Sequence, residues 1–238
     1  MITITPNILN AALLHAREDA PRECCGLVNV MHGRQIYHRC RNISETDTNF
    51  VIDTEDWATV EDKGEIVMVV HSHPITNPQP SPADLVHIEK SGLPWLIVNP
   101  ATGQYTVNEP NGYKAPLVGR AFHHGVLDCL ALVRDYYAEL GIEIPDYPRE
   151  NNWWMQGKNY YRELCGECGF IELPADDIRL HDVILMCMAA PVDNHGAIYI
   201  GNDNILHHVT GRLSCRESYG GWWRKVTTGV LRHRSLIS

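Results

Sequence analysis

The sequence predicts two domains of different class, an α/β domain followed by an α+β domain. In the first half, predicted strands and helices alternate, whereas in the second half helices come first and strands follow. Between the halves, residues 108–116 are polar and contain residues that break helices and strands. We therefore expect one domain at residues 1–110 and a second at residues 111–238.

The elements of the first half follow from hydrophobic spacing and from turn residues. Apolar side chains at helical spacing over 7–19, with Asn7 as a candidate cap, predict a first helix. The apolar segment 66–70 predicts a buried strand. Residues 82–91 predict an amphipathic helix that stops at Gly92. Strands are also expected at 26–31, 35–41, 50–52, 95–98 and 104–107, and a short helix at 57–62.

In the second half, the same reasoning predicts two helices and then three strands. A helix over 130–140 ends at Gly141, and a longer helix is expected over 153–168. Strands are expected at 183–188, 195–200 and 205–209, and the turn at 201–204 makes a hairpin of the last two.

The composition excludes several classes of function. The formal net charge is -9 and lysines and arginines form no cluster, so we expect no binding to nucleic acid. No apolar run approaches the ~18 residues of a membrane span, and the first residues show no signal-peptide pattern. The eight cysteines then predict no disulfide framework. Cys165 and Cys168 form a lone CxxC pair, for which free thiols are the default interpretation.

The most specific chemical signal directly follows the apolar segment 66–70. His71 and His73 are one residue apart, so along a strand their side chains point to the same side. Ser81 and Asp84 follow at the start of the predicted helix. Two imidazoles and one carboxylate make three ligands for zinc, and they leave a fourth position open, as in catalytic zinc sites.

A simpler interpretation of Ser81 and Asp84 is helix capping. Ser81 is a good N-cap, Pro82 fits the first helical position, and Asp84 provides an acid at the third. The two interpretations are compatible, because a capped helix start is a rigid place to hold a ligand.

This spacing resembles the JAMM metalloprotease motif: His-Ser-His-Pro, six residues, Ser, two residues, Asp. The resemblance implies that His71, His73 and Asp84 hold Zn²⁺ as cofactor. It also implies that Glu23, just before an apolar segment, is the general base and that Ser81 stabilises the oxyanion. Such chemistry is reasonable near neutral pH, because zinc lowers the pKa of water from ~15.7 to about 7.

A second candidate site lies in the second half. Cys129 opens the helix over 130–140, where the helix dipole favours a thiolate. The predicted hairpin brings His195 near His207 or His208. A cysteine, a base and a group that orients the base make up a generalised catalytic triad. Taken singly, a buried cysteine or a hydrogen-bonded histidine needs no catalytic role.

This half resembles the NlpC-type cysteine peptidases, which have a papain-like fold and cut peptide stems of bacterial cell walls. The resemblance rests on Asp-Cys at a helix start, on His-Gly-Ala-Ile-Tyr-Ile-Gly-Asn and on a histidine twelve residues after the first. It implies that Cys129 is the nucleophile, His195 the base and His207 the orienting group. Phe122 stands where the family often has an aromatic hydroxyl, so one oxyanion contact is missing there.

The order of the two motifs resembles a family of tail assembly proteins of lambda-like phages and prophages. It implies a hydrolase, a zinc metallopeptidase joined to a cysteine endopeptidase, with phage tail-tip proteins and peptidoglycan peptides as partners. The expected location is the host cytoplasm during tail assembly, or the tip of the finished tail. The alternative is a structural assembly factor whose peptidase folds are catalytically idle, because a fold does not guarantee activity.

Overall fold

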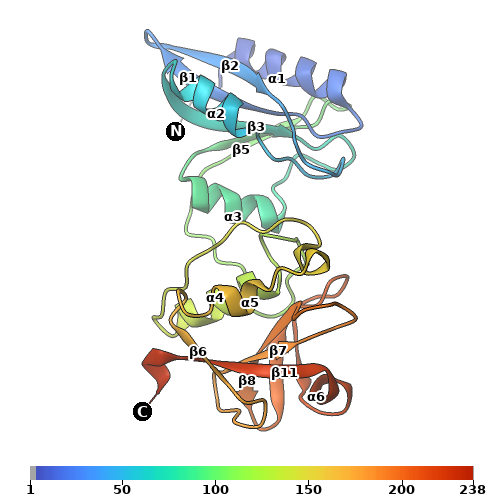
Figure 1. Ribbon diagram of the computed structural model, residues 1–238. Coiled ribbons are helices and arrows are strands. Elements are labelled where there is room, and N and C mark those ends of the chain that lie inside the picture. The colour runs from blue at the N-terminus through green and yellow to red at the C-terminus, as the bar shows by residue number, and fades with distance from the viewer. Residues whose placement is uncertain (1–3, 238) are drawn as a thin grey trace. The chain divides into compact units, whose positions relative to one another are not determined.

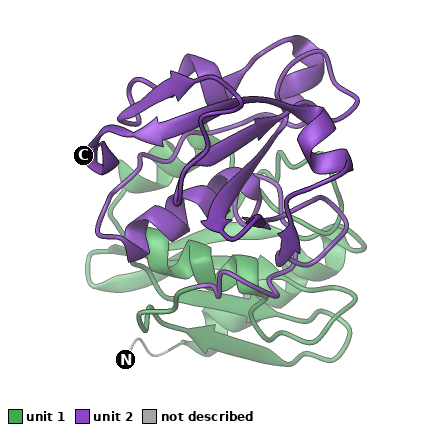
Figure 2. Cartoon of the chain, turned by 90° about the horizontal axis from the view of Figure 1, so that it is seen from below, with its two compact units in different colours: residues 1–114 green, residues 115–238 purple. Residues whose placement is uncertain are grey.

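The computed structural model describes residues 4–237, and the chain divides into two compact units between Lys114 and Ala115. Figure 2 shows the two units in different colours. Four buried apolar clusters form the cores, and each lies within one unit among the described residues. Each unit therefore has a core of its own.

The first unit is a five-stranded sheet with helices on both faces (Figure 1). The strand order is β2-β1-β3-β4-β5, and only β3 and β4 run parallel. The elements are α1 (Pro6–Asp19), β1 (Cys25–Met31), β2 (Arg34–Cys40), α2 (Thr54–Glu61), β3 (Glu65–Ser72), α3 (Pro82–Ser91), β4 (Trp95–Val98) and β5 (Tyr105–Asn108).

The alternation of side chains along β3 decides which helix faces the candidate histidines. Met68 and Val70 pack with α1 on one face of the sheet. Val69 packs on the other face, with Ile88 of α3. His71 has the same parity as Val69 and therefore lies on the face that α3 covers.

The second unit is an antiparallel sheet of six strands in the order β10-β9-β8-β7-β11-β6. Helix α4 packs against one face, and Trp223 and Val226 of α6 pack against the other. The elements are α4 (Cys129–Glu139), a 3₁₀ helix (Trp153–Gln156), α5 (Tyr160–Glu163), β6 (Phe170–Leu173), β7 (Val183–Met186), β8 (His195–Gly201), β9 (Asn204–His207), β10 (Cys215–Ser218), α6 (Trp222–Val226), β11 (Thr227–His233) and a 3₁₀ helix (Arg234–Leu236).

The fold class is the one expected, but several of the predicted elements differ from the observed ones. The predicted helix over 153–168 is wrong: Gly157, with a φ of 77°, ends a 3₁₀ helix, and only one short helix follows. Residues 50–52 form an isolated bridge from Ile52 to Asn42 and no strand. The first helix is capped by Thr5 instead of Asn7, with Pro6 at its first position.

Within residues 4–237, no helix is long and apolar enough to cross a membrane. All eight cysteines are free, and Cys165 and Cys168 lie half-buried just after α5.

Candidate active sites

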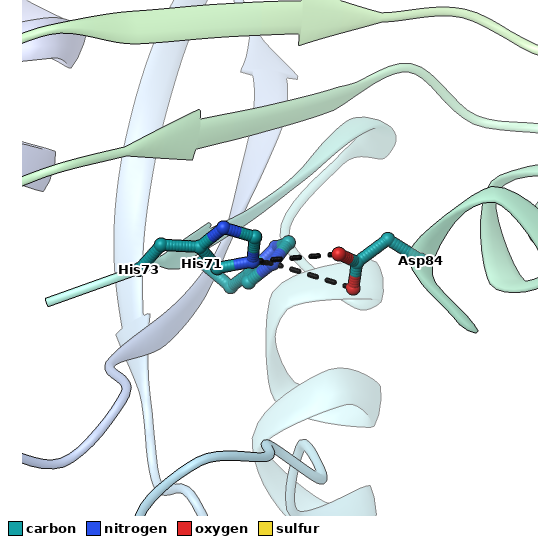
Figure 3. Close-up of side chains that lie close together, drawn as sticks. All are labelled: His71, His73 and Asp84. Carbon is teal, nitrogen blue, oxygen red and sulfur yellow. Dashed lines mark hydrogen bonds and ion pairs between the residues drawn. The ribbon is translucent and has the colours of Figure 1, made fainter. Parts of the chain in front are cut away.

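The three predicted ligands of the first unit come together (Figure 3). His71 is the last but one residue of β3, His73 directly follows the strand, and Asp84 points at both imidazoles from the first turn of α3. All three side chains are buried. The strand end and the helix start thus bring two nitrogens and a carboxylate to one point.

The distances fit zinc. Nε2 of His71 lies 3.1 Å from Nε2 of His73, and each lies 3.4 Å from one oxygen of Asp84. Ligand atoms about 2.0–2.1 Å from a tetrahedral zinc are roughly 3.3 Å apart. The donor set, two imidazoles and a carboxylate, is one that zinc accepts, so the residues fit the ion.

Neighbouring groups hold the imidazoles in place. Nδ1 of His73 lies 2.9 Å from the carbonyl of Asn77, which fixes the proton on Nδ1 and leaves Nε2 as a ligand atom. Asn99 donates hydrogen bonds to the carbonyls of His73 and Thr76 and supports this turn. The ring of Phe50, in the segment expected to be a strand, stacks on His71 at 4.6 Å.

Burial and mutual contact shift the pKa values of the three groups. Burial lowers the pKa of His71 to about 4, against the attraction of Asp84. Burial opposes charge on Asp84 as well, but the hydrogen bond to His73 and the charge of His71 outweigh it, so the pKa of Asp84 is lowered. Burial also acts to lower the pKa of His73, but its hydrogen bonds with Asp84 and the backbone of Asn77 outweigh burial and raise it. The ionised Asp84 is in the state that a metal ligand requires, and a bound ion would displace the proton from either imidazole.

Glu23 and Ser81 lie beside this group. Glu23 is buried directly before β1, and burial raises its pKa to about 7, with His73 lowering and Asp84 raising it. Ser81 is the N-cap of α3: its hydroxyl accepts from the N–H of Asp84, and its own N–H donates to Oδ2 of Asp84 at 2.7 Å. Asp84 is therefore part of a capping box and also faces the histidines.

In the second unit, Cys129 is the first residue of α4. Asp128 caps the helix by accepting from the N–H of Ala131, and Arg149 binds both of its oxygens at 2.8 Å. Both side chains of this ion pair are almost completely buried. The ion pair fixes the helix start, and with it the thiol.

A hydroxyl that the sequence analysis missed reaches the thiol. Tyr161 of α5 donates a hydrogen bond to Sγ of Cys129 at 3.1 Å. It comes from the segment wrongly expected to be one long helix, 32 residues after the cysteine. No regular spacing in the sequence predicts Tyr161, because its contact with Cys129 depends on how α5 packs against α4.

The two strand histidines also meet. Nε2 of His195 lies 3.2 Å from Nδ1 of His207, and both side chains are buried. His208 is also buried, but its two ring nitrogens have no hydrogen-bond partner in the described structure. Of the two candidates, His207 is therefore the one that contacts His195.

Cys129 and His195 share a pocket of about 450 Å³. Its other lining residues are Phe122, His124, Asp128, Leu130, Trp153, Trp154, Met188, Asn194, His208 and Thr210. A larger, mainly apolar pocket of about 610 Å³ in the same unit contains neither Cys129 nor His195. Of these two pockets, the smaller one is therefore the one that contains the candidate nucleophile and base.

The resting charge state differs from the thiolate that the helix start led us to expect. Burial and the charge of Asp128 raise the pKa of Cys129 to about 11, although hydrogen bonds from Tyr161 and the backbone of Gly196 act in the opposite direction. Burial, with His207 and His208, lowers the pKa of His195 to about 3. Burial thus favours the neutral form of both the thiol and the imidazole.

Comparison with known families agrees with both units. Residues 5–110 match a family described as prokaryotic homologs of the JAB domain, and residues 119–232 match the NlpC/P60 family. These matches confirm the expected fold class of each half.

Three relatives extend the comparison. The tail tip assembly protein K of Escherichia phage N15 is 36% identical over 96% of this chain and 95% of its own length. The tail tip assembly protein K of Escherichia phage lambda is 41% identical over 76% of this chain and 88% of its own length. A CysO-cysteine peptidase of Mycobacterium tuberculosis (strain ATCC 25618 / H37Rv) is 30% identical over 42% of this chain and 73% of its own. The chain therefore belongs to the family of the phage tail tip assembly proteins K and carries a JAB-like domain followed by an NlpC/P60 domain.

Proposed function

We propose that the protein acts in assembly of a phage tail tip and carries two peptidase sites. The names of the relatives from phages N15 and lambda support the assembly role. Two observations carry the enzymatic part: His71, His73 and Asp84 meet in the first unit. In the second unit, Cys129 and His195 line one pocket and His195 contacts His207. The assembly role implies other tail-tip proteins as partners and work in the host cytoplasm; a place at the tip of the finished tail is part of the proposal.

In the first unit, His71, His73 and Asp84 would hold zinc. The ion would supply Lewis-acid chemistry, polarising a carbonyl and making water more acidic. Glu23, with a pKa raised to about 7, accepts the proton of the attacking water and returns it to the leaving amine. Ser81, at the start of α3, would donate its hydroxyl hydrogen to the developing oxyanion. The M. tuberculosis relative, named a peptidase, supports an (iso)peptidase activity.

Zinc content tests this assignment. The full chain and a His71→Ala/His73→Ala variant would be compared by metal analysis after removal of loose ions. We expect the variant to lose one equivalent of zinc per chain, because Asp84 alone cannot close the site. Equal zinc in both proteins would overturn the assignment.

In the second unit, we propose that Cys129 attacks a carbonyl of a cell-wall peptide. His195 accepts the thiol proton through Nδ1, because its Nε2 faces His207. The sulfur–carbon bond forms, the amine leaves with the proton from His195, and water then releases the acyl group. Tyr161, which lies beside the thiol, is placed to donate to the oxyanion in place of the hydroxyl that Phe122 lacks.

Hydrolysis of purified peptidoglycan tests this site. We expect the full chain to release stem-peptide fragments and Cys129→Ala to release none while keeping its zinc. The matched control is Cys187→Ser, a half-buried cysteine outside both sites, which should cut as fast as the unchanged chain. If neither peptidoglycan nor tail-tip proteins are cut, the protein is better interpreted as a structural assembly factor whose peptidase folds are catalytically idle.

A further inference from the structure

A second group of metal-type ligands lies in the second unit. A ring nitrogen of His207, Sγ of Cys215 and a carboxylate oxygen of Glu217 all lie within 4.8 Å of one another. We propose that these three residues bind a zinc-type divalent ion and that the bound ion switches off the cysteine site through His207.

The sheet register explains why the three side chains meet. His207 of β9 lies directly opposite Cys215 of β10. Glu217 is two residues further along β10, so its side chain is on the same face as that of Cys215. The contact results from regular strand pairing, which makes it a rigid arrangement.

His207 supplies the observation that points to a ligand. It is completely buried, and Nε2 has no hydrogen-bond partner in the described structure. Oε2 of Glu217 lies 3.3 Å from this nitrogen, at ion-pair distance. An unpaired buried nitrogen costs free energy. The 3.3 Å separation equals that of two ligand atoms on a tetrahedral zinc, roughly 3.3 Å.

The donor set favours zinc over calcium or magnesium. A thiolate and an imidazole select soft or borderline ions, whereas calcium and magnesium prefer oxygen. Trp223 donates to Oε2 of Glu217 at 3.1 Å and orients the carboxylate. Arg212 opposes a cation by its charge, but it is half exposed and binds the other carboxylate oxygen, Oε1. Cys215 and Glu217 are partly exposed, so an ion can enter.

Coupling to the cysteine site follows from the tautomers of two imidazoles and rests on the proposed peptidase function. An ion on Nε2 of His207 leaves Nδ1 as the only place for the ring proton. Nδ1 then donates to Nε2 of His195, 3.2 Å away. A neutral His195 must in turn carry its own proton on Nδ1. It can no longer accept the proton of Cys129.

Cobalt binding tests the site without any activity. Co²⁺ bound to a thiolate absorbs in the near ultraviolet, and His71, His73 and Asp84 of the first unit include no thiol. We expect the full-length protein, reduced and titrated with Co²⁺, to show this band. Cys215→Ser should remove it, and Glu217→Gln should weaken Co²⁺ binding by about tenfold or more. The matched control is Cys165→Ser/Cys168→Ser, which should keep the band.

The outcomes separate the proposals. No band in the unchanged chain, a band that persists in Cys215→Ser, or a band lost in the double control would overturn the site. For the coupling, Zn²⁺ should slow the release of stem-peptide fragments from peptidoglycan at least tenfold in the unchanged chain and not in Cys215→Ser. Equal slowing in both proteins would mean that zinc acts on Cys129 directly, and would overturn the coupling. Because the band needs no substrate, an inactive cysteine site would not affect it.

Discussion

At the scale of single residues, burial decides the direction of the pKa shift for four of the groups in the two sites. Glu23, His71, Cys129 and His195 all have pKa values moved toward the neutral form, and burial is the largest cause in each case. Buried groups of this kind stay neutral until a substrate or an ion stabilises their charged form.

Replacing Glu23 with glutamine separates catalysis from metal binding. We expect Glu23→Gln to keep its zinc and to lose hydrolysis by the first unit by roughly 10²–10⁴-fold, because the amide cannot accept a proton. Zinc analysis and turnover of a cleavable peptide would be measured on the same sample. The exposed Glu65 offers a control: Glu65→Gln should change neither. A Glu23→Gln variant as fast as the unchanged chain would show that another group is the base.

The pH dependence of Cys129 alkylation follows from its raised pKa. Only the thiolate reacts, so with a pKa of about 11 the rate should rise close to tenfold per pH unit from 7 to 10. It should show no plateau near neutrality, which a thiolate–imidazolium pair would give. Mass spectrometry of each cysteine after a short pulse of iodoacetamide would measure the rates. A plateau between pH 5 and 8 would refute the neutral resting pair.

The residues that the sequence could indicate are those with fixed spacing in the chain. His71, His73 and Asp84 meet because a strand end and a helix start each impose a period on the side chains. No spacing in the sequence predicts Tyr161 or Asn99, because their contacts depend on the packing of elements far apart in the sequence.

At the scale of elements, close packing of α5 against β8 holds the cysteine site together. A Cβ added at Gly196, the residue after His195, would lie 2.7 Å from the ring of Tyr161. The strand start therefore needs a glycine, so that the tyrosine can lie over it and reach Cys129.

Gly196→Ala should consequently disturb both stability and the site. We expect the free energy of unfolding to fall by about 1–3 kcal/mol, as for other overpacked cores. We also expect Cys129 to alkylate faster as Tyr161 moves away. Denaturant unfolding and pulse labelling would measure the two effects. Gly166→Ala is the matched control, because a Cβ there meets nothing within 4 Å; equal effects of both variants would contradict the packing argument.

Elements were predictable where hydrophobic periodicity was long and ended at a clear stop. The strand before His71 and the helix after Ser81 met both conditions. The region 153–168 has apolar and aromatic residues at helix-like spacing, but Gly157 takes a φ of 77° and divides it. Strands β6, β10 and β11 and the short helix α6 were not predicted from the sequence. Strand β10 has a half-exposed alternating pattern.

At the scale of the whole molecule, the separate cores predict separate stabilities. Leu27 is completely buried in the first unit. Leu27→Ala should cost about 2–5 kcal/mol there, because a core leucine leaves a cavity. Hydrogen exchange followed by mass spectrometry should show faster exchange in residues 4–114 and unchanged exchange in residues 115–237. Leu132→Ala, in the second core, should give the reverse. Equal acceleration in both units would mean that they unfold as one.

The capping box of α3 offers a way to recognise an idle first site among related chains. The cap needs only an oxygen at position 84 to accept from the N–H of Ser81, and an asparagine amide supplies one. The ion needs a charged carboxylate that also faces two imidazoles. A relative with serine at 81 and asparagine at 84 would thus keep the helix start and lose the ligand. The residue at position 84 in a related chain therefore distinguishes a site that has kept its metal ligand from one that has kept only its helix cap.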